Sequence, residues 1–128
     1  MKLNLEIQKE ISSQWFKFLQ FQICKEFEIL ERKKNKKFNN KIFKKRSWQK
    51  SQKNLNQGGG ISAIMRDGLV FESLGVNFSK VSGKFSKRFR SQILGAKKNP
   101  NYWASGISIV AHMKNPKIPA MHFNTRFI

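Results

Sequence analysis

Two apolar-rich runs near the C-terminus, Trp103–Met113 and Ala120–Ile128, most restrict how this chain can fold. The residues between them read Lys-Asn-Pro-Lys-Ile-Pro, and this break combines turn-forming residues with two prolines. Two strands joined by a loop are the structure that such a pattern predicts. The C-terminal part of the chain is therefore expected to form a β-hairpin within a sheet.

The predicted hairpin gathers polar side chains on one side, because alternate residues of a strand point to the same face. On the first strand this side holds Ser108, Val110 and His112. On the second strand it holds His122, Asn124 and Arg126, whereas Met121, Phe123, Thr125 and Phe127 point the other way. Both histidines of the chain are thus expected on one face. The spacing alone also allows a simpler interpretation, in which these are ordinary half-buried or solvent-facing polar residues.

Residues 1–34 are predicted to contain a long amphipathic helix from Leu5 to Lys34. Its apolar stripe recurs at steps of three and four residues and consists of Ile7, Ile11, Trp15, Leu19, Ile23, Phe27 and Leu30. Phe16, Phe18 and Phe21 widen the stripe, so we expect it to pack against a large apolar surface. Cys24 lies beside the stripe and is expected to be a packed thiol. The polar face mixes Glu with Lys, which disfavours the alternative of a membrane-surface helix.

Residues 35–56 are predicted to be a basic connector between this helix and the sheet. From Arg32 to Lys53 the chain has many lysines and arginines but no acidic residue, with interleaved apolar side chains at Phe38, Ile42, Phe43 and Trp48. Basic and aromatic residues together can bind nucleic acid, which is the competing interpretation. No zinc-finger spacing, ribonucleoprotein motif or basic zipper is present, so a solvated connector is favoured.

The remaining residues, 57–128, are predicted to form the sheet. Gly58-Gly59-Gly60 lacks the pattern of a P-loop or a dinucleotide site and indicates a tight backbone path or a close approach to a ligand. Asp67-Gly68 suits a tight turn between strands at 61–65 and 69–74, and residues 75–81 alternate as a further strand. A short helix near 86–94 is expected, capped by Ser86 and closed by Gly95.

These elements predict an α+β fold with a mostly antiparallel sheet flanked by helices. A chain of 128 residues with one cysteine is a single small domain without an internal disulfide, which suits the cytoplasm. No apolar run is long enough to span a bilayer, and the start lacks a signal-peptide apolar region, so no membrane partner is expected. The formal net charge of +19 favours polyanionic ligands.

Several segments together resemble the oxygen-dependent coproporphyrinogen III oxidases of haem biosynthesis. They occur in the family's order between about Trp15 and Ile128: Gly58–Gly60, Val70-Phe71-Glu72, Gly75–Ser79, Trp103–Ser108, His112–Pro116 and His122–Phe127. This family converts coproporphyrinogen III to protoporphyrinogen IX by oxidative decarboxylation, with O2 as co-substrate and no organic cofactor. Two departures from its pattern are three glycines in place of four, and Met113 where a proline is usual.

The resemblance implies roles for individual residues. His122 matches the catalytic proton donor, and the substrate-binding positions match Ser108, Asn124, Thr125 and Arg126. His112 matches one ligand of a divalent metal, whose other ligands lie beyond the residues of this chain. Arginine suits carboxylate recognition and imidazole suits proton exchange near neutral pH. The resemblance also implies a homodimer.

Family members are much longer than this chain, so the resemblance indicates residues 1–128 as an incomplete, N-terminal domain of such an enzyme. Two hypotheses follow. The first is an oxidoreductase of haem biosynthesis, present as a partial chain. The second is a non-enzymatic basic protein that binds nucleic acid or another polyanion through Arg32–Lys53.

Overall fold

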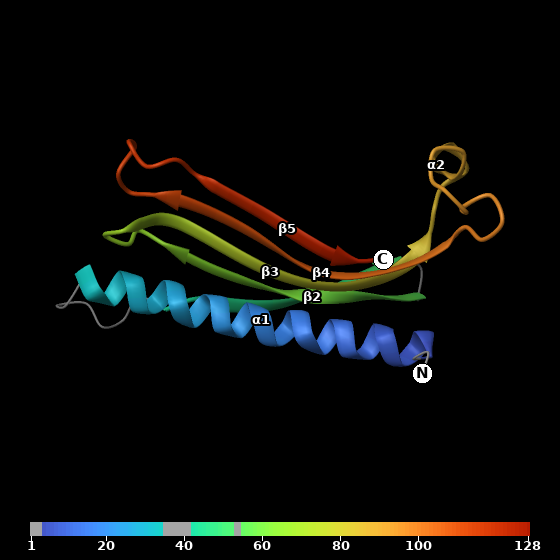
Figure 1. Ribbon diagram of the computed structural model, residues 1–128, viewed down its shortest axis with the longest axis horizontal. Coiled ribbons are helices and arrows are strands. Elements are labelled where there is room, and N and C mark those ends of the chain that lie inside the picture. The colour runs from blue at the N-terminus through green and yellow to red at the C-terminus, as the bar shows by residue number, and fades with distance from the viewer. Residues whose placement is uncertain (1–3, 35–41, 53–54) are drawn as a thin grey trace.

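The computed structural model describes residues 4–34, 42–52 and 55–128 as a long helix packed on a five-stranded sheet (Figure 1). The elements in chain order are α1 (Leu5–Lys34), β1 (Lys44–Gln52), β2 (Leu55–Arg66), β3 (Phe71–Lys84), α2 (Lys87–Arg90), β4 (Asn101–Met113) and β5 (Met121–Phe127). The predicted α+β class and the long N-terminal helix are confirmed.

The sheet is a simple meander in which the strands lie in the order β1-β2-β3-β4-β5 and every neighbouring pair is antiparallel. The predicted turn at Asp67-Gly68 joins β2 to β3. Asp67 has a φ of 59°, and its N–H donates to the carbonyl of Glu72 at 2.9 Å. The predicted C-terminal hairpin is present as β4 and β5, with the Pro-containing break as its loop.

One long strand, β3, replaces the two strands expected at 69–74 and 75–81. Gly75, the predicted boundary, lies within the ladder, opposite Ile64 of β2 and Val110 of β4. Pairing on both sides keeps the backbone extended through this glycine, so the expectation of a break was wrong.

The predicted connector at 35–56 was wrong for residues 44–52, which form the edge strand β1, and for residues 55 and 56, which begin β2. Most of its side chains from Lys44 to Gln49 are exposed. Edge strands with charged side chains are common, because solvated charges discourage pairing with another chain. A basic, polar sequence is therefore compatible with an edge strand as well as with a connector. Residues 35–41 and 53–54 of the predicted connector lie outside the described residues.

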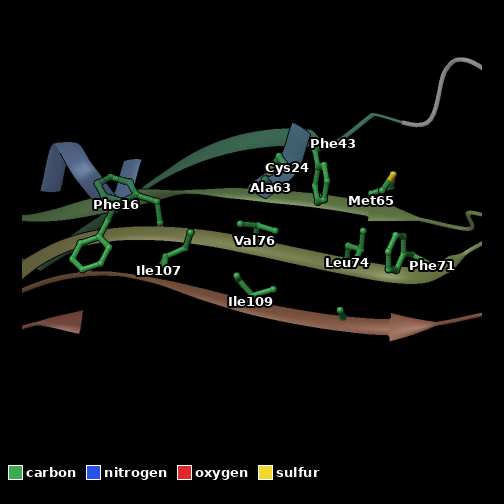
Figure 2. Packing of buried hydrophobic residues seen from close by; sticks show 12 residues of the cluster. Phe16, Cys24, Phe43, Ala63, Met65, Phe71, Leu74, Val76, Ile107 and Ile109 are labelled. Carbon is green, nitrogen blue, oxygen red and sulfur yellow. The ribbon is translucent and has the colours of Figure 1, made fainter. Parts of the chain in front are cut away.

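The hydrophobic core lies between α1 and one face of the sheet (Figure 2). Phe16 and Cys24 of α1 lie over side chains from β2, β3 and β4. The buried strand residues of this cluster are Ala63, Met65, Phe71, Leu74, Val76, Phe78, Ile107, Ile109 and Ala111, joined by Phe43 just before β1. Cys24 is only 2% exposed, which confirms the prediction of a packed thiol.

The face that α1 turns to the sheet differs from the predicted stripe. Leu19, Ile23 and Phe27 are half-buried against the core, but Ile7, Ile11, Trp15 and Leu30 are exposed. The buried side chains of the helix are Ser13, Phe16, Gln20, Cys24, Glu28 and Glu31. The predicted stripe was therefore wrong at these four exposed positions, because polar residues occupy much of the helix face that contacts the sheet.

Main-chain partners in the sheet explain the burial of these polar helix residues. Gln20 Nε2 donates to the carbonyls of Ile61 and Val76, both at 2.8 Å. Glu28 accepts a hydrogen bond from the N–H of Phe43 at 3.2 Å. The fully buried Glu31 carboxylate accepts from the N–H groups of Leu69, Val70 and Phe71. A buried polar group is tolerated where it is hydrogen-bonded in this way.

The segment between β3 and β4 rises from one end of the sheet on the side away from α1 (Figure 1). Its helix α2 covers only Lys87–Arg90, shorter than the predicted helix near 86–94, and turns follow. Ser86 occupies the N-cap position without a side-chain capping bond, whereas Gly95 adopts the expected positive φ, 81°. No helix among the described residues is long and apolar enough to cross a membrane.

Candidate functional site

The face of the sheet that points away from α1, here called the open face, carries mainly small and polar side chains. Because successive strand residues alternate, it consists of the residues between those that form the core. Its members on the inner strands and β5 are Gly60, Ser62, Ile64, Arg66, Ser73, Gly75, Asn77, Ser79, Gly106, Ser108, Val110, His112, His122, Asn124 and Arg126. The predicted face of the C-terminal hairpin is part of this surface.

Both histidines meet on the open face. His122 of β5 lies opposite Val110 of β4, and His112 follows Val110 by two residues on the same face of β4, so the two imidazoles are diagonal neighbours across these strands. On its other side His112 lies opposite Ser73 of β3. Their Nε2 atoms are 3.4 Å apart, and the ring planes are inclined by 45°. Both side chains are exposed, so a ligand on this face can reach both rings.

The spacing of the two Nε2 atoms allows two chemical uses. One ring can donate a hydrogen bond to the other when their tautomers are complementary. Alternatively, both nitrogens can bind one divalent cation, because two ligands about 2.1 Å from a tetrahedral ion lie about 3.4 Å apart. Among the described residues no third His, Cys, Asp or Glu joins the pair to complete a metal site.

A polar cluster lies further along the same two strands. Ser108 is directly opposite Asn124, and Arg126 is opposite Gly106. Arg126 Nε donates to Asn124 Oδ1 at 3.1 Å, which orients the guanidinium group. A Cβ at position 106 would lie 2.8 Å from Arg126 Cγ, so a glycine there leaves room for the arginine stem. Arg126 forms no salt bridge with another described residue and is available to an anionic ligand.

The charge distribution favours anions on the open face. The chain has no Asp or Glu from Ser73 to Ile128. The salt bridges among the described residues all involve a glutamate of α1, on the other side of the sheet. Arg126, the single Lys or Arg residue of β4 and β5, therefore has no acidic neighbour within these two strands, and a positive group attracts carboxylates or phosphates.

A sequence profile of the family described as coproporphyrinogen III oxidase matches residues 11–128. The chain belongs to this family. Its matched region includes every residue of the open face, so the histidine pair and the polar cluster lie within the part that the family shares.

Curated relatives agree with this assignment. The chain is 47% identical over 128 residues to the oxygen-dependent coproporphyrinogen-III oxidase of Rickettsia africae, a match that covers 98% of this chain and 44% of the relative. It is 50% identical over 123 residues to the enzyme of the same name from Rickettsia typhi, covering 94% and 42%. The chain thus spans less than half the length of the curated relatives it matches.

The open face of this coproporphyrinogen III oxidase family member carries the predicted metal ligand His112 and four of the other predicted site residues. These four are Ser108, His122, Asn124 and Arg126. Thr125 does not join them, because it lies opposite Ile107 and its side chain is on the α1 side of the sheet. A contact between Thr125 and a ligand on the open face would therefore have to involve the main chain.

Sequence reasoning missed two polar neighbours, Ser62 and Asn77. The register places Ser62, Asn77, Ser108 and Asn124 in one row across β2 to β5. Ser62 and Asn77 form no side-chain hydrogen bond with another described residue, so their polar groups are available to a ligand. Strand parity would have indicated them, but only once the strand order was known.

A cavity of about 500 Å³ lies near the N-terminal half of α1 and is separate from the histidine pair. Its lining includes Lys17, Gly59, Lys80 and Trp103. Ile61 and Phe78, which pack toward α1, also line it, so it opens mainly on the covered side of the sheet. Gly58–Gly60 line this cavity, but the predicted catalytic, substrate-binding and metal-binding residues are absent from its lining, so the open face remains the better candidate site.

Proposed function

We propose that this protein takes part in the oxygen-dependent oxidative decarboxylation of coproporphyrinogen III to protoporphyrinogen IX. The observation that supports this most is the convergence of His112 and His122 with Arg126 on one uncovered, cationic face of the sheet. The substrate is a ring with four propionates, and an anion-attracting face with a proton-exchanging group suits its chemistry. The printed names of the relatives, which are oxygen-dependent oxidases, give further support.

In this proposal Arg126 binds a propionate carboxylate through two parallel N–H donors, an arrangement that guanidinium groups favour. Asn124 holds the arginine by its Nε contact, which leaves the remaining N–H groups for the substrate. Ser108 lies opposite Asn124 and adds a hydroxyl that can donate to or accept from the substrate. Thr125 contributes through its main chain.

The proton balance of the reaction gives His122 a role. Conversion of one propionate to vinyl and CO2 releases a proton and two electrons. Two such conversions release four electrons, which reduce one O2 to two molecules of water with the uptake of four protons. Two protons must therefore come from elsewhere, and His122, an exposed imidazole on the binding face, is the proposed donor.

His112 is the proposed ligand of a divalent metal. Its Nε2 lies 3.4 Å from that of His122, so a cation bound to His112 would be within reach of both rings. A bound divalent cation would supply positive charge beside the substrate. The remaining donors would have to come from outside the described residues or from the substrate.

The proposal also includes a cytoplasmic location and a homodimer, both from the family resemblance. Ile7, Ile11, Trp15 and Phe18 on the outer side of α1 are exposed and offer apolar area that a second polypeptide would bury. Light scattering on the purified chain would give its mass in solution. A strictly monomeric chain at all concentrations would contradict the homodimer.

A chimera tests the proposed activity most directly. The chain would replace the matching segment of the Rickettsia africae relative, with which it is 47% identical. We expect the chimera to convert coproporphyrinogen III aerobically, as measured by protoporphyrin fluorescence after oxidation. His122→Ala in the chimera should abolish turnover, whereas Lys45→Gln, on the opposite face of the sheet, should not.

Two results would contradict the proposal. The first is a folded chimera that binds the substrate but shows no turnover. The second is equal turnover with and without the imidazole of His122. Circular dichroism of each variant separates both results from a failure to fold.

A further inference from the structure

The proposed function uses residues of β4 and β5 and gives no role to the basic run from Arg32 to Lys53. Part of it forms β1, the edge strand at the opposite side of the sheet from β5. Trp48 lies opposite Gly60, and Arg46 lies opposite Ser62. Gly60 and Ser62 both belong to the open face. Arg46 and Trp48 therefore point to the same side of the sheet as the histidine pair.

The register joins Arg46 to the polar cluster by a continuous row. Arg46, Ser62, Asn77, Ser108 and Asn124 are successive partners across all five strands. With about 4.8 Å between neighbouring strands, the two ends of this row are roughly 19 Å apart. Arg126 lies two residues beyond Asn124 on the same face, so each edge of the sheet carries an arginine.

Trp48 provides an apolar surface beside Arg46 on β1, at the end of the row that crosses the sheet through Gly60, Ser79 and Gly106 to Arg126. A Cβ at position 60 would lie 2.7 Å from Cζ2 and 2.9 Å from Cε2 of the indole, so the ring lies directly over Gly60. The side chain stays 38% exposed. An exposed aromatic face on a floor of small residues can stack against a flat ring.

Arg46 is free to bind an anion. Its side chain is exposed and forms no salt bridge or hydrogen bond with another of the described residues. Lys50, further along β1, is already engaged, because its Nζ donates to Tyr102 Oη of β4. Arg46 thus offers an uncommitted guanidinium at the edge opposite Arg126.

We propose that β1 forms a second carboxylate-binding edge, in which Arg46 binds a propionate remote from the one held by Arg126 and Trp48 stacks against the ring system. This inference rests on the substrate class of the proposed function, a tetrapyrrole macrocycle with flat pyrrole rings and carboxylates around its rim. A molecule with four carboxylates that lies across the row presents anionic groups to both edges of the sheet at once.

A charge-matched pair of variants tests this inference in the chain itself. Arg46→Gln and Lys45→Gln remove one positive charge each at adjacent positions, but Lys45 points to the covered side, with its Nζ 5.2 Å from the centre of the Phe21 ring. The probe is coproporphyrin III, the fluorescent oxidised form of the substrate, and the readout is its fluorescence anisotropy. We expect Arg46→Gln to weaken binding roughly ten- to hundred-fold and Lys45→Gln by less than about threefold.

A porphyrin with only two propionates provides the second arm. Its carboxylates can engage the Arg126 edge alone, so Arg46→Gln should change its affinity by less than about threefold. Trp48→Leu should weaken the binding of both porphyrins, because it removes the stacking surface and no charge.

Several outcomes would overturn the inference. One is an equal effect of Arg46→Gln and Lys45→Gln on coproporphyrin III. Another is wild-type chain that does not bind this porphyrin. A third is an equally large effect of Arg46→Gln on a single-stranded oligonucleotide, which would indicate a general polyanion surface. Because binding is measured without turnover, an inactive chimera with intact Arg46-dependent binding would reject the proposed function and leave this inference standing.

Discussion

The two faces of the sheet differ in almost every physical property. The covered face consists of closely packed apolar side chains such as Leu74, Val76 and Ile107, each at most 2% exposed beneath α1. On the open face the alternate residues are mainly glycines, serines and asparagines, with arginines and histidines toward the edges. The same strands therefore serve the stability of the fold on one side and offer binding groups on the other.

This division has a consequence for the effects of mutations. Removal of a covered side chain leaves a cavity and lowers the free energy of unfolding. Removal of an open-face side chain leaves the core intact, and under the proposed function it changes ligand binding. Asn77 and Val76 are adjacent in β3 and illustrate the contrast, since one is available to solvent and the other is fully buried.

The largest effect is expected at the centre of the covered face. Leu74→Ala should lower the free energy of unfolding by about 2–5 kcal/mol, because Leu74 is 2% exposed and its loss leaves a cavity. Urea denaturation followed by circular dichroism would measure this. Asn77→Ala, on the open face of the same strand, should stay within about 0.5 kcal/mol of the wild type. Equal losses in the two variants would refute the division between the faces.

A smaller effect is expected where α1 is bound to the β2–β3 turn. Glu31→Gln should lower the free energy of unfolding by about 1–3 kcal/mol, because the amide NH2 would face the N–H groups of Val70 and Phe71, which now donate hydrogen bonds to the carboxylate. The exposed Glu26 on the same helix supplies the control, and Glu26→Gln should have little effect on the denaturation midpoint. A Glu31→Gln protein as stable as this control would show that the contact contributes nothing.

The smallest effect concerns the thiol beneath α1. Burial raises the pKa of Cys24 to about 11 from an ordinary value of 9.0. Because the folded state holds this proton more tightly than the unfolded state, the thiol's contribution to stability is complete below pH about 9 and is lost as the pH rises toward about 11. Thiolate absorbance should therefore titrate at higher pH in the folded chain than in urea. Coincident titrations would contradict burial of the thiol.

Local patterns in the sequence were sufficient to predict the C-terminal hairpin and its polar face. Alternation along a strand is a property of the backbone, so Ser108 and His112 could be assigned to one side without knowledge of their neighbours. The meeting of His112 with His122 also needed the register of β4 and β5, which the length of the loop suggested but did not determine.

Tertiary partners explain what the sequence did not reveal. Gln20, Glu28 and Glu31 looked like outward-facing helix residues, because polarity usually marks exposure. Their main-chain partners lie 15 to 56 residues away in the sequence, so no local pattern could indicate that they are buried. The role of β1 was hidden for a similar reason. A strand with Lys44, Arg46 and Trp48 resembles a basic linker until its pairing with β2 is known.

The most direct test of the division between faces is an NMR titration of the chain with coproporphyrin III. The chain has only two histidines, so a ¹H–¹⁵N correlation spectrum of the imidazole resonances reports on His112 and His122 alone. We expect both imidazoles to shift strongly, while the methyl resonances of Leu74, Val76 and Ile109 on the covered face shift little. Strong methyl shifts with unchanged imidazole resonances would place the ligand on the α1 side and contradict the assignment of the open face as the binding surface.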